Sequence, residues 1–578
     1  MQQHQKRRPS QDILPPISSR RRTGGSHDSA SRSPQLPTAA LGGRTQRSAQ
    51  DDDVSSSSET ADSRGSPSEN TRDKEISSHV RERLLEYFKQ YASNALPTHL
   101  LRVKDMRLAT RDEIWEEISP QLEKISDAEL KKGWVLGHMA GENLFKEWCK
   151  ERVQFYVKYA IFSHRWGMGE PDFHEMSSRR RRKKISPGRP GYKKLLGFCE
   201  KAGEYECKYA WSDTCCINKE SSAELEEAIR SMYRWYKDAE VCIVYLGEST
   251  TLENFEREPW FTRGWTLQEL LAPKRMRFYG RDWAPICPDT QGKHDDEDGE
   301  SSRAKPTNDK ENASIVATIS EVAGIPEDDI REFHPSCHRV AQKMGWASKR
   351  QTTRLEDVAY SLIGIFDISI PVAYGEGSRA FHKLMEAISQ NCKEPEFFAW
   401  AGDPSPHSLG FPSSPACYRK FDPQLAHPLA PANPLRQAGD PSFTSTKLGL
   451  QVNLFVIPVT CFRYRPDRNN STHSNYYRFT PTDPEDTPVT DVPLPTETFF
   501  QTSVPNNYVL GIANYERDGE TRGVLRARDQ YFCILLQRDN DHLGWIREHT
   551  DSVLTLYCTE SITRQLETIC LLHSSSRY

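Results

Sequence analysis

The sequence has few apolar residues and no long apolar run. Hydrophobic residues make up 36% of the 578 residues, so part of the chain is too polar to form a packed core. No stretch approaches the roughly 20 apolar residues that a membrane-spanning helix requires, and the first residues lack the apolar run of a signal peptide. These absences predict a cytoplasmic protein with no membrane partner.

The sequence also lacks the patterns of several common kinds of site. Its 14 cysteines form no CxxC pair, which indicates reduced thiols and not a disulfide framework or a zinc module. The 77 basic and 81 acidic residues leave a net charge of -4, so no general field attracts nucleic acid. No P-loop, GxGxxG, HExxH or GxSxG motif stands in a convincing context. The sequence therefore predicts no metal site and no required cofactor.

Composition and periodicity divide the chain into parts of different character. The first residues are rich in Ser, Arg and Pro and cannot bury enough apolar surface to order. Helical periodicity follows, and the last part contains the strand-like runs LGLQVNLFVIPV, NNYVLGIANYE, QYFCILLQR and SVLTLYC. The predicted parts are a disordered tail at 1–76, a helical segment at 77–157, an α/β domain at 158–286, an acidic disordered insertion at 287–312, a helical extension at 313–400 and a β-rich domain at 401–578.

Residues 158–286 alternate short apolar runs with amphipathic helices. Runs with strand character lie at 159–163, 209–212, 241–246 and 275–279. Strands that are buried on both faces and joined by helices form a parallel, doubly wound sheet. The predicted fold class is therefore α/β, a doubly wound parallel sheet with flanking helices and a separate β-rich domain. Ligands in such folds bind beyond the carboxyl ends of the strands.

Three local patterns outside the strands give further predictions. Residues 178–190, with the basic run Arg179–Lys184, and residues 289–312, with the acidic run HDDEDGE, are too polar to pack and are predicted as surface loops. The basic run fits a solvated loop, a phosphate-binding patch or a nuclear-localisation signal, so nuclear entry is the alternative to a cytoplasmic location. Thr353 and Glu356 have the spacing of a capping box before a helical stripe that begins at Leu355.

Several long motifs carry a resemblance to a known family. They are YAIFSHRWG from Tyr159, YAWSDTCCINKESSAELEEAIRSMYRWYKDAEVCIVYL from Tyr209, WFTRGWTLQELLAP from Trp260 and a continuation from Val340 to Gly377. In this order they resemble the HET (heterokaryon incompatibility) domain of filamentous fungi. HET domains are associated with vegetative incompatibility, in which fusion of unlike strains triggers death of the mixed cell. The resemblance implies a protein that triggers regulated cell death after non-self recognition, by signalling or self-assembly with itself or another incompatibility protein.

The same motifs show a more distant similarity to TIR domains. YAIFSHRWG is similar to the first TIR strand and loop, and AEVCIVYL before WTLQEL is similar to the third strand and the helix with a W-C-L-x-E-L motif. The similarity implies a TIR/flavodoxin-like sheet. In TIR domains that cleave NAD, the Glu of that motif is catalytic, and Glu269 matches it here. Thr266 replaces the motif's Cys, and the spacing between strand and motif differs. NAD cleavage is thus the alternative to a signalling role, and whether the protein is an enzyme stays open.

Glu269 has the chemistry that such a reaction needs. Breaking the nicotinamide–ribose bond builds positive charge on the sugar, and a carboxylate in a water-poor pocket stabilises that charge. Trp166 would stack on the departing ring, and Arg165 would bind a phosphate. The other reading makes Glu269 a solvated helix residue near Lys274 or Arg263. The predicted nucleotide-binding residues are Ser163, His164, Arg165, Trp166 and Asp213.

These residues have plain structural readings as well. Arg165 and Trp166 would instead pack the loop by stacking and a carboxylate contact, and Asp213 would cap the turn that follows it. A different enzyme, a thiol hydrolase, would use Cys215 or Cys216 with His164 as base. A nucleophilic Cys needs a lowered pKa and a base within reach, whereas free cysteines are usually small buried hydrophobes.

Overall fold

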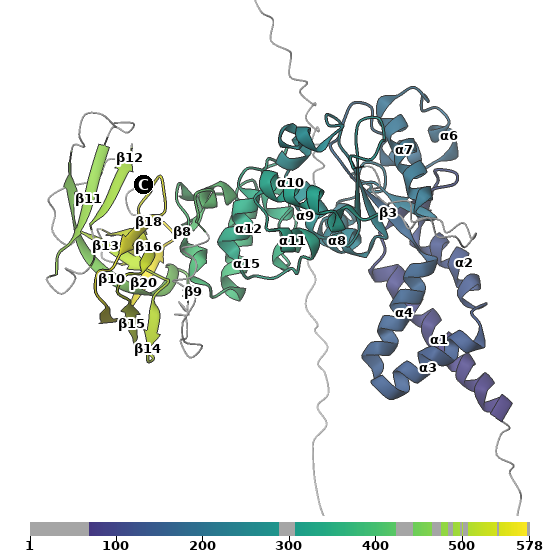
Figure 1. Ribbon diagram of the computed structural model, residues 1–578, viewed down its shortest axis with the longest axis horizontal. Coiled ribbons are helices and arrows are strands. Elements are labelled where there is room, and N and C mark those ends of the chain that lie inside the picture. The colour runs from purple at the N-terminus through teal and green to yellow at the C-terminus, as the bar shows by residue number, and fades with distance from the viewer. Residues whose placement is uncertain are drawn as a thin grey trace, which may run out of the picture. The chain divides into compact units, whose positions relative to one another are not determined.

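The computed structural model describes residues 69–287, 307–422 and 443–574, the last part with gaps at 465–474, 484–488, 490, 497–499, 501–506 and 540–542. The predicted tail therefore lies outside the described residues except for 69–76, and the acidic run HDDEDGE lies wholly outside them. Helix α1 (Glu69–Asn94) begins inside the segment predicted to be disordered (Figure 1). Among the described residues, no helix combines the length and the apolar character needed to cross a membrane.

A mixed sheet with the strand order β2-β1-β4-β3-β5-β6 forms the centre of the α/β part. The four predicted strands are β3 (Tyr159–His164), β4 (Tyr209–Trp211), β5 (Val241–Tyr245) and β6 (Met276–Tyr279). They lie side by side and all pairs among them are parallel. The prediction of adjacent parallel strands is confirmed.

Two further strands come from the segment predicted to be purely helical. Strand β1 (His99–Arg102) pairs antiparallel with β4 and with β2 (Leu108–Thr110). The sheet is therefore mixed and not entirely parallel. The hairpin is a correction to the prediction, and it covers the edge of β4 that would otherwise expose unpaired backbone groups.

Helices pack on both faces of this sheet. In β3, Phe162 stacks on Phe198 of α7 (Pro190–Glu204), with ring centroids 4.3 Å apart. Tyr159 donates instead to the carbonyl of Trp235 in α8 (Ser222–Asp238), at 2.6 Å. Because successive side chains of a strand point to opposite faces, α7 and α8 cover opposite faces of the sheet.

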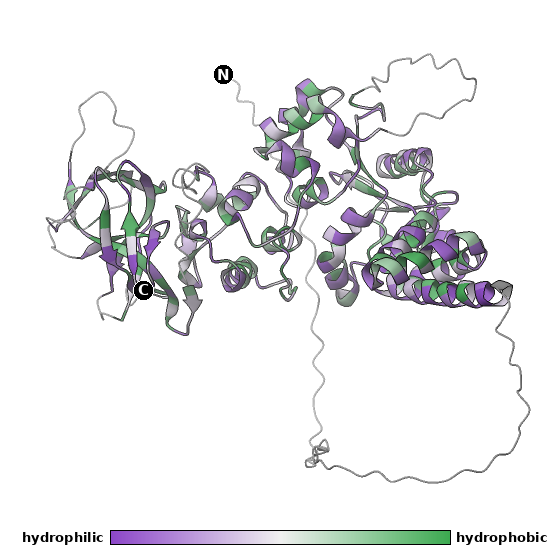
Figure 2. Ribbon diagram, turned by 60° about the horizontal axis from the view of Figure 1, so that its bottom comes forward, coloured by the Kyte–Doolittle hydropathy of each residue, from purple (hydrophilic) through white to green (hydrophobic). Residues whose placement is uncertain are grey.

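The segment before β3 and the extension after β6 are largely helical, as predicted. Leu84 and Phe88 of α1 are fully buried, and α1 carries hydrophobic and hydrophilic residues along its length (Figure 2). The remaining helices are α2 (Arg111–Leu122), α3 (Asp127–Ala140), α4 (Glu142–Tyr156), α10 (Ala313–Ala323), α11 (Glu327–Arg331), α12 (Val340–Ala347), α13 (Asp357–Tyr360), α14 (Ile363–Phe366) and α15 (Arg379–Asn391).

The capping box predicted at Thr353 is absent. Helix α13 begins at Asp357, and Leu355 is 69% exposed, so Leu355 is no part of a buried stripe. The Glu356 carboxylate accepts instead from the backbone N–H groups of Gly375 and Gly377, at 2.8 and 3.0 Å. The sequence pattern predicts that the Glu356 carboxylate caps the start of a helix. It accepts hydrogen bonds from a glycine-rich loop instead.

The two polar insertions pack at their ends, contrary to prediction. In the first, Arg189 donates to the Gly169 carbonyl at 2.8 Å and pairs with Glu175, while Ile185 is buried. In the second, Asp309 and Lys310 are both buried. Asp309 pairs with the buried Arg277 guanidinium, which offsets the cost of burying its charge. Lys310 instead donates to the Leu271 carbonyl at 3.4 Å, and burial lowers its pKa to about 7.

The β-rich part contains the four predicted strand-like runs as β10 (Gly449–Arg463), β13 (Tyr508–Ile512), β16 (Gln530–Arg538) and β18 (Leu554–Tyr557). They belong to one antiparallel-rich sheet, with the order β12-β11-β10-β13-β16-β17-β20 and with β18 paired to β16. The other strands in this order are β11 (Asn475–Pro481), β12 (Val492–Thr496), β17 (Trp545–Arg547) and β20 (Glu567–Leu572). A core of buried apolar residues lies on this sheet. The prediction of a β-rich C-terminal part is confirmed.

Gly364 of α14 is expected to tolerate no side chain, because α14 packs on α8. A Cβ added there would lie 2.3 Å from Cβ of Tyr233. We expect Gly364→Ala to lower the free energy of unfolding by about 1–3 kcal/mol, measured by urea denaturation. Gly203→Ala is the matched control, since a Cβ there meets nothing closer than 3.9 Å. Equal stabilities of the two variants would contradict the packing.

Candidate active site

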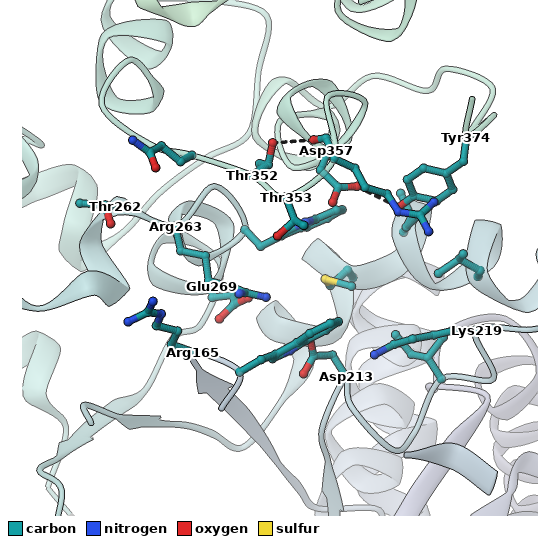
Figure 3. A pocket seen from close by; sticks show the side chains of 18 of the residues that line it. Arg165, Asp213, Lys219, Thr262, Arg263, Glu269, Thr352, Thr353, Asp357 and Tyr374 are labelled. Atoms are coloured by element: carbon teal, nitrogen blue, oxygen red, sulfur yellow. Dashed lines mark hydrogen bonds between the residues drawn. The ribbon is translucent and has the colours of Figure 1, made fainter. Parts of the chain in front are cut away.

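A cavity of about 570 Å³ opens at the carboxyl ends of β3 and β4. Figure 3 shows Arg165, Asp213, Arg263 and Glu269 around the same space. One wall is the apolar face of α8, with Ile229 among its residues. The facing wall comes from residues 351–374, far along the chain. A cavity at this end of a parallel sheet is where α/β folds place their ligands.

Glu269 lies in this cavity on α9 (Thr266–Leu271) and is only 6% exposed. The Ser163 hydroxyl donates to its Oε2 at 2.6 Å, and the Trp260 indole N–H donates to the Ser163 oxygen at 2.8 Å. Burial raises the pKa of Glu269 to about 7, and the Asp213 carboxylate adds to the rise. The reading of Glu269 as a solvated helix residue is therefore wrong.

Ser163 and His164 are neighbours in β3, so their side chains point to opposite faces of the sheet and cannot both bind a ligand in this cavity. Ser163 faces α9, whereas the His164 ring stacks on Phe162 on the other face, with centroids 4.1 Å apart. His164 is buried and does not line the cavity, and burial lowers its pKa well below the usual value. The alternation of a strand thus separates two residues that the sequence analysis grouped together.

The other predicted residues line the cavity and also contact one another. The Trp166 indole N–H donates to Oδ2 of Asp213 at 2.7 Å, and Trp166 remains 44% exposed. Arg165 lies 3.4 Å from Glu248. Four of the six predicted site residues therefore line the cavity, and a fifth, Ser163, is hydrogen-bonded to Glu269. Arg165 and Trp166 also form the contacts with carboxylates that a purely structural role predicts.

Several cavity residues were not predicted from the sequence. All of them lie within the motifs that carry the family resemblance, but none stands at the end of a predicted strand or matches a catalytic position. What they share is a contact with an aromatic ring or a carboxylate of the cavity. They are Lys219, Arg263, Trp265, Arg354, Asp357 and Tyr374.

The helical extension is tied to the Glu269 segment by backbone and guanidinium contacts. Gly264 N–H donates to the Gln351 carbonyl at 2.8 Å, and Gln351 N–H donates to the Thr262 carbonyl at 2.6 Å. The Arg350 guanidinium donates to the Arg263 carbonyl at 3.0 Å and to Thr266 Oγ1 at 2.9 Å, and burial lowers the pKa of Arg350 to about 10. These bonds position the turn that precedes α9, the helix that carries Glu269.

Tyr374 reaches the cavity from the loop that Glu356 holds. Its hydroxyl donates to Oδ1 of Asp357 at 2.8 Å, and burial raises the pKa of Asp357. The Tyr360 hydroxyl accepts from the Ala373 N–H at 2.8 Å and so fixes the same loop. The extension thus forms the second wall of the cavity through an ordered set of hydrogen bonds.

The geometry does not support the thiol hydrolase. Cys215 and Cys216 are fully buried, and the adjacent Cys216 thiol together with burial raises the pKa of Cys215 well above its usual value. A thiol in this state is no nucleophile. Within the described ranges, no group of three His, Cys, Asp or Glu side chains is placed to hold a metal ion.

Comparisons with known proteins agree on the central part of this region. The model of the family described as heterokaryon incompatibility protein (HET) matches residues 159–254. A stretch of 245 residues is 38% identical to vegetative incompatibility protein HET-E-1 of Podospora anserina, and it covers 40% of this chain and 16% of that protein. No solved structure matches the chain. The matched residues run from β3 past β5 and include Arg165, Trp166 and Asp213, so the chain contains a HET domain.

Proposed function

We propose that this chain is a heterokaryon incompatibility-type protein whose HET domain triggers regulated cell death after non-self recognition. The support is the HET domain at 159–254 and the identity of 38% to a vegetative incompatibility protein. The chain spans about 16% of the length of that relative, so the proposal rests on the domain. Its partner would be a second copy of this chain or another incompatibility protein, and it would act in the cytoplasm.

We further propose that the trigger is the cleavage of NAD in the cavity. The observation that carries this proposal is the buried Glu269 carboxyl, oriented by Ser163 at 2.6 Å and lining a cavity of about 570 Å³. Ligand sites commonly have volumes of roughly 300–1,000 Å³. Water would add to the ribose carbon as the bond to nicotinamide breaks, which gives nicotinamide, ADP-ribose and the proton that the water loses. The ionised Glu269 would stabilise the positive charge that develops on the sugar.

The strand order supports a TIR-like arrangement of this site. The parallel strands stand in the spatial order β4-β3-β5-β6, which is second, first, third and fourth along the chain. This is the flavodoxin-like order, in which ligands bind at the switch point beside the first strand. Ser163, at the end of β3, lies at that switch point and contacts Glu269. Trp166 would then stack on the nicotinamide ring.

An assay of the purified protein, together with a test in cells, separates NAD cleavage from signalling by contact. The purified full chain is incubated with NAD, with and without an induced dimeriser fused to it, and free nicotinamide is measured. We expect nicotinamide release that the Glu269→Gln variant lacks. Death of cells that express Glu269→Gln, without loss of NAD, would show that the domain signals by contact and is no hydrolase.

The pH dependence of the reaction is expected to report on Glu269 and Asp213. The active form is the carboxylate, so activity should rise with pH through about 7, the raised pKa of Glu269. The Asp213 carboxylate contributes to the raised pKa of Glu269, so removing its charge should lower the pKa of Glu269. Asp213→Asn keeps an acceptor for Trp166 and should move the rise in activity to lower pH. A pH profile identical to that of the wild type would show that Asp213 has no electrostatic effect on the reacting carboxyl.

A further inference from the structure

Three cations that line the cavity have no acidic partner in the part of the chain that the structure describes. Lys219, Arg263 and Arg354 all line it, and no carboxylate oxygen among the described residues lies within 4 Å of their charged nitrogens. Arg165, on the same rim, pairs with Glu248. Unpaired cations around a cavity indicate a ligand that brings the negative charge.

Each of the three cations instead lies over an aromatic ring of the same cavity. Lys219 Nζ is 3.9 Å from the centroid of the Trp166 ring, and Arg263 Cζ is 5.1 Å from it. Arg354 Cζ is 4.3 Å from the centroid of Tyr374. Contact with a ring holds a cation in place but leaves its hydrogen-bond donors free.

The nearby carboxylates accept hydrogen bonds from neutral donors. Asp213 accepts from the Trp166 indole N–H, and Asp357 accepts from the Tyr374 hydroxyl. Glu269 accepts from Ser163. The positive charge at Trp166 and at Tyr374 is therefore not neutralised by these groups through direct ion pairs.

We propose that Lys219, Arg263 and Arg354 form a diphosphate subsite. Lys219 and Arg263 both contact the Trp166 ring and would bind one phosphate. Arg354, on the facing wall, would bind the second phosphate. The guanidinium fork donates two parallel hydrogen bonds to a phosphate, and the ammonium acts as a point charge. The ligand class is a nucleoside diphosphate or a dinucleotide that contains one. This inference rests on the proposed function only in assigning the ribosyl bond of the same ligand to Glu269.

Binding of ADP and adenosine to the full chain tests the subsite without catalysis. By calorimetry, we expect ADP to bind the wild type at least about tenfold more tightly than adenosine, since hydrogen bonds to charged groups have such effects. Lys219→Met combined with Arg263→Met should remove that difference and leave adenosine binding unchanged, and Arg354→Met should reduce it. The affinity for ADP should also fall with added salt in the wild type. Arg230→Met is the control, because Arg230 is on α8 but pairs with Glu226 outside the cavity.

Variants that keep the positive charge are controls for substitutions that merely disrupt folding. Lys219→Arg and Arg263→Lys should keep most of the preference for ADP, whereas equal affinity of the wild type for ADP and adenosine would overturn the proposal. A preference for ADP that survives Lys219→Met with Arg263→Met would overturn it as well. If ADP is preferred but NAD is not cleaved, the subsite stands and the catalytic proposal fails. If NAD is cleaved with an unchanged KM in these variants, the reverse holds.

Discussion

Glu269→Gln is expected to reduce the cleavage of NAD by about 10²–10³-fold or more, because it removes the charge that stabilises the sugar cation. The fold should survive, since the amide oxygen of Gln can still accept from Ser163, which donates to Glu269 at 2.6 Å. Nicotinamide release by the full chain measures the effect. Glu396→Gln is the matched control, because burial also raises the pKa of Glu396 to about 7 but Glu396 does not line the cavity.

The same substitution is expected to stabilise the protein at high pH. Burial raises the pKa of Glu269 from 4.5 to about 7, so the protonated carboxyl is the form that the folded state prefers. Its contribution to stability is complete below pH 4.5 and is lost as the pH rises through 7. The loss corresponds to about 3 kcal/mol. Glu269→Gln should therefore match the wild type near pH 5 and exceed its free energy of unfolding at pH 8.

Urea denaturation at the two pH values measures this difference. An inactive variant that is also more stable at pH 8 is what a site under functional constraint predicts. Full activity of Glu269→Gln, with Glu396→Gln also active, would end the proposal that this carboxyl is catalytic. A variant that loses stability at both pH values would instead indicate a purely structural carboxyl.

Asp309→Ala is expected to lower the free energy of unfolding by about 3–5 kcal/mol, the usual cost of removing one partner of a buried ion pair. Asp309 accepts from the Arg277 guanidinium at 2.8 Å and from the Phe278 N–H at 2.7 Å. Both charged side chains are buried. The substitution would leave the Arg277 charge of strand β6 without its carboxylate, and urea denaturation measures the cost.

Glu311→Ala is the control for this prediction. Glu311 lies in the same 3₁₀ turn, Asp309–Glu311, but is exposed. Its removal should change the stability by less than about 0.5 kcal/mol. Equal effects of the two substitutions would show that the end of the acidic insertion does not hold the edge of the sheet.

The order of strands and helices was predictable because a strand that is buried on both faces is a continuous apolar run in the sequence. Val241, Cys242 and Ile243 form an uninterrupted apolar run, and such a run between amphipathic helices is typical of a parallel sheet. The β1–β2 hairpin has no such run. Its strands have four and three residues, and β1 pairs with β4 about a hundred positions away, so tertiary contacts decide its structure.

The candidate site was predictable to the extent that it lies at strand ends or in a motif. Glu269, Trp166 and Asp213 met those conditions and line the cavity. His164 met the first condition but faces α7, because neighbours in a strand alternate. The packing of Asp309 was missed since its partner Arg277 lies in a separate strand.

Periodicity thus predicted a parallel α/β core, and the order of the motifs, through their resemblance to HET and TIR domains, predicted a HET domain and pointed to Glu269. These features could be predicted because each depends on residues that are close in sequence or on a recognisable pattern. The second wall of the cavity depends on contacts between residues about 90 positions apart, such as Arg350 with Arg263. Burial, the raised pKa of Glu269 and the cations over Trp166 arise only when those distant segments pack together, since each is a property of the surroundings and not of the residue.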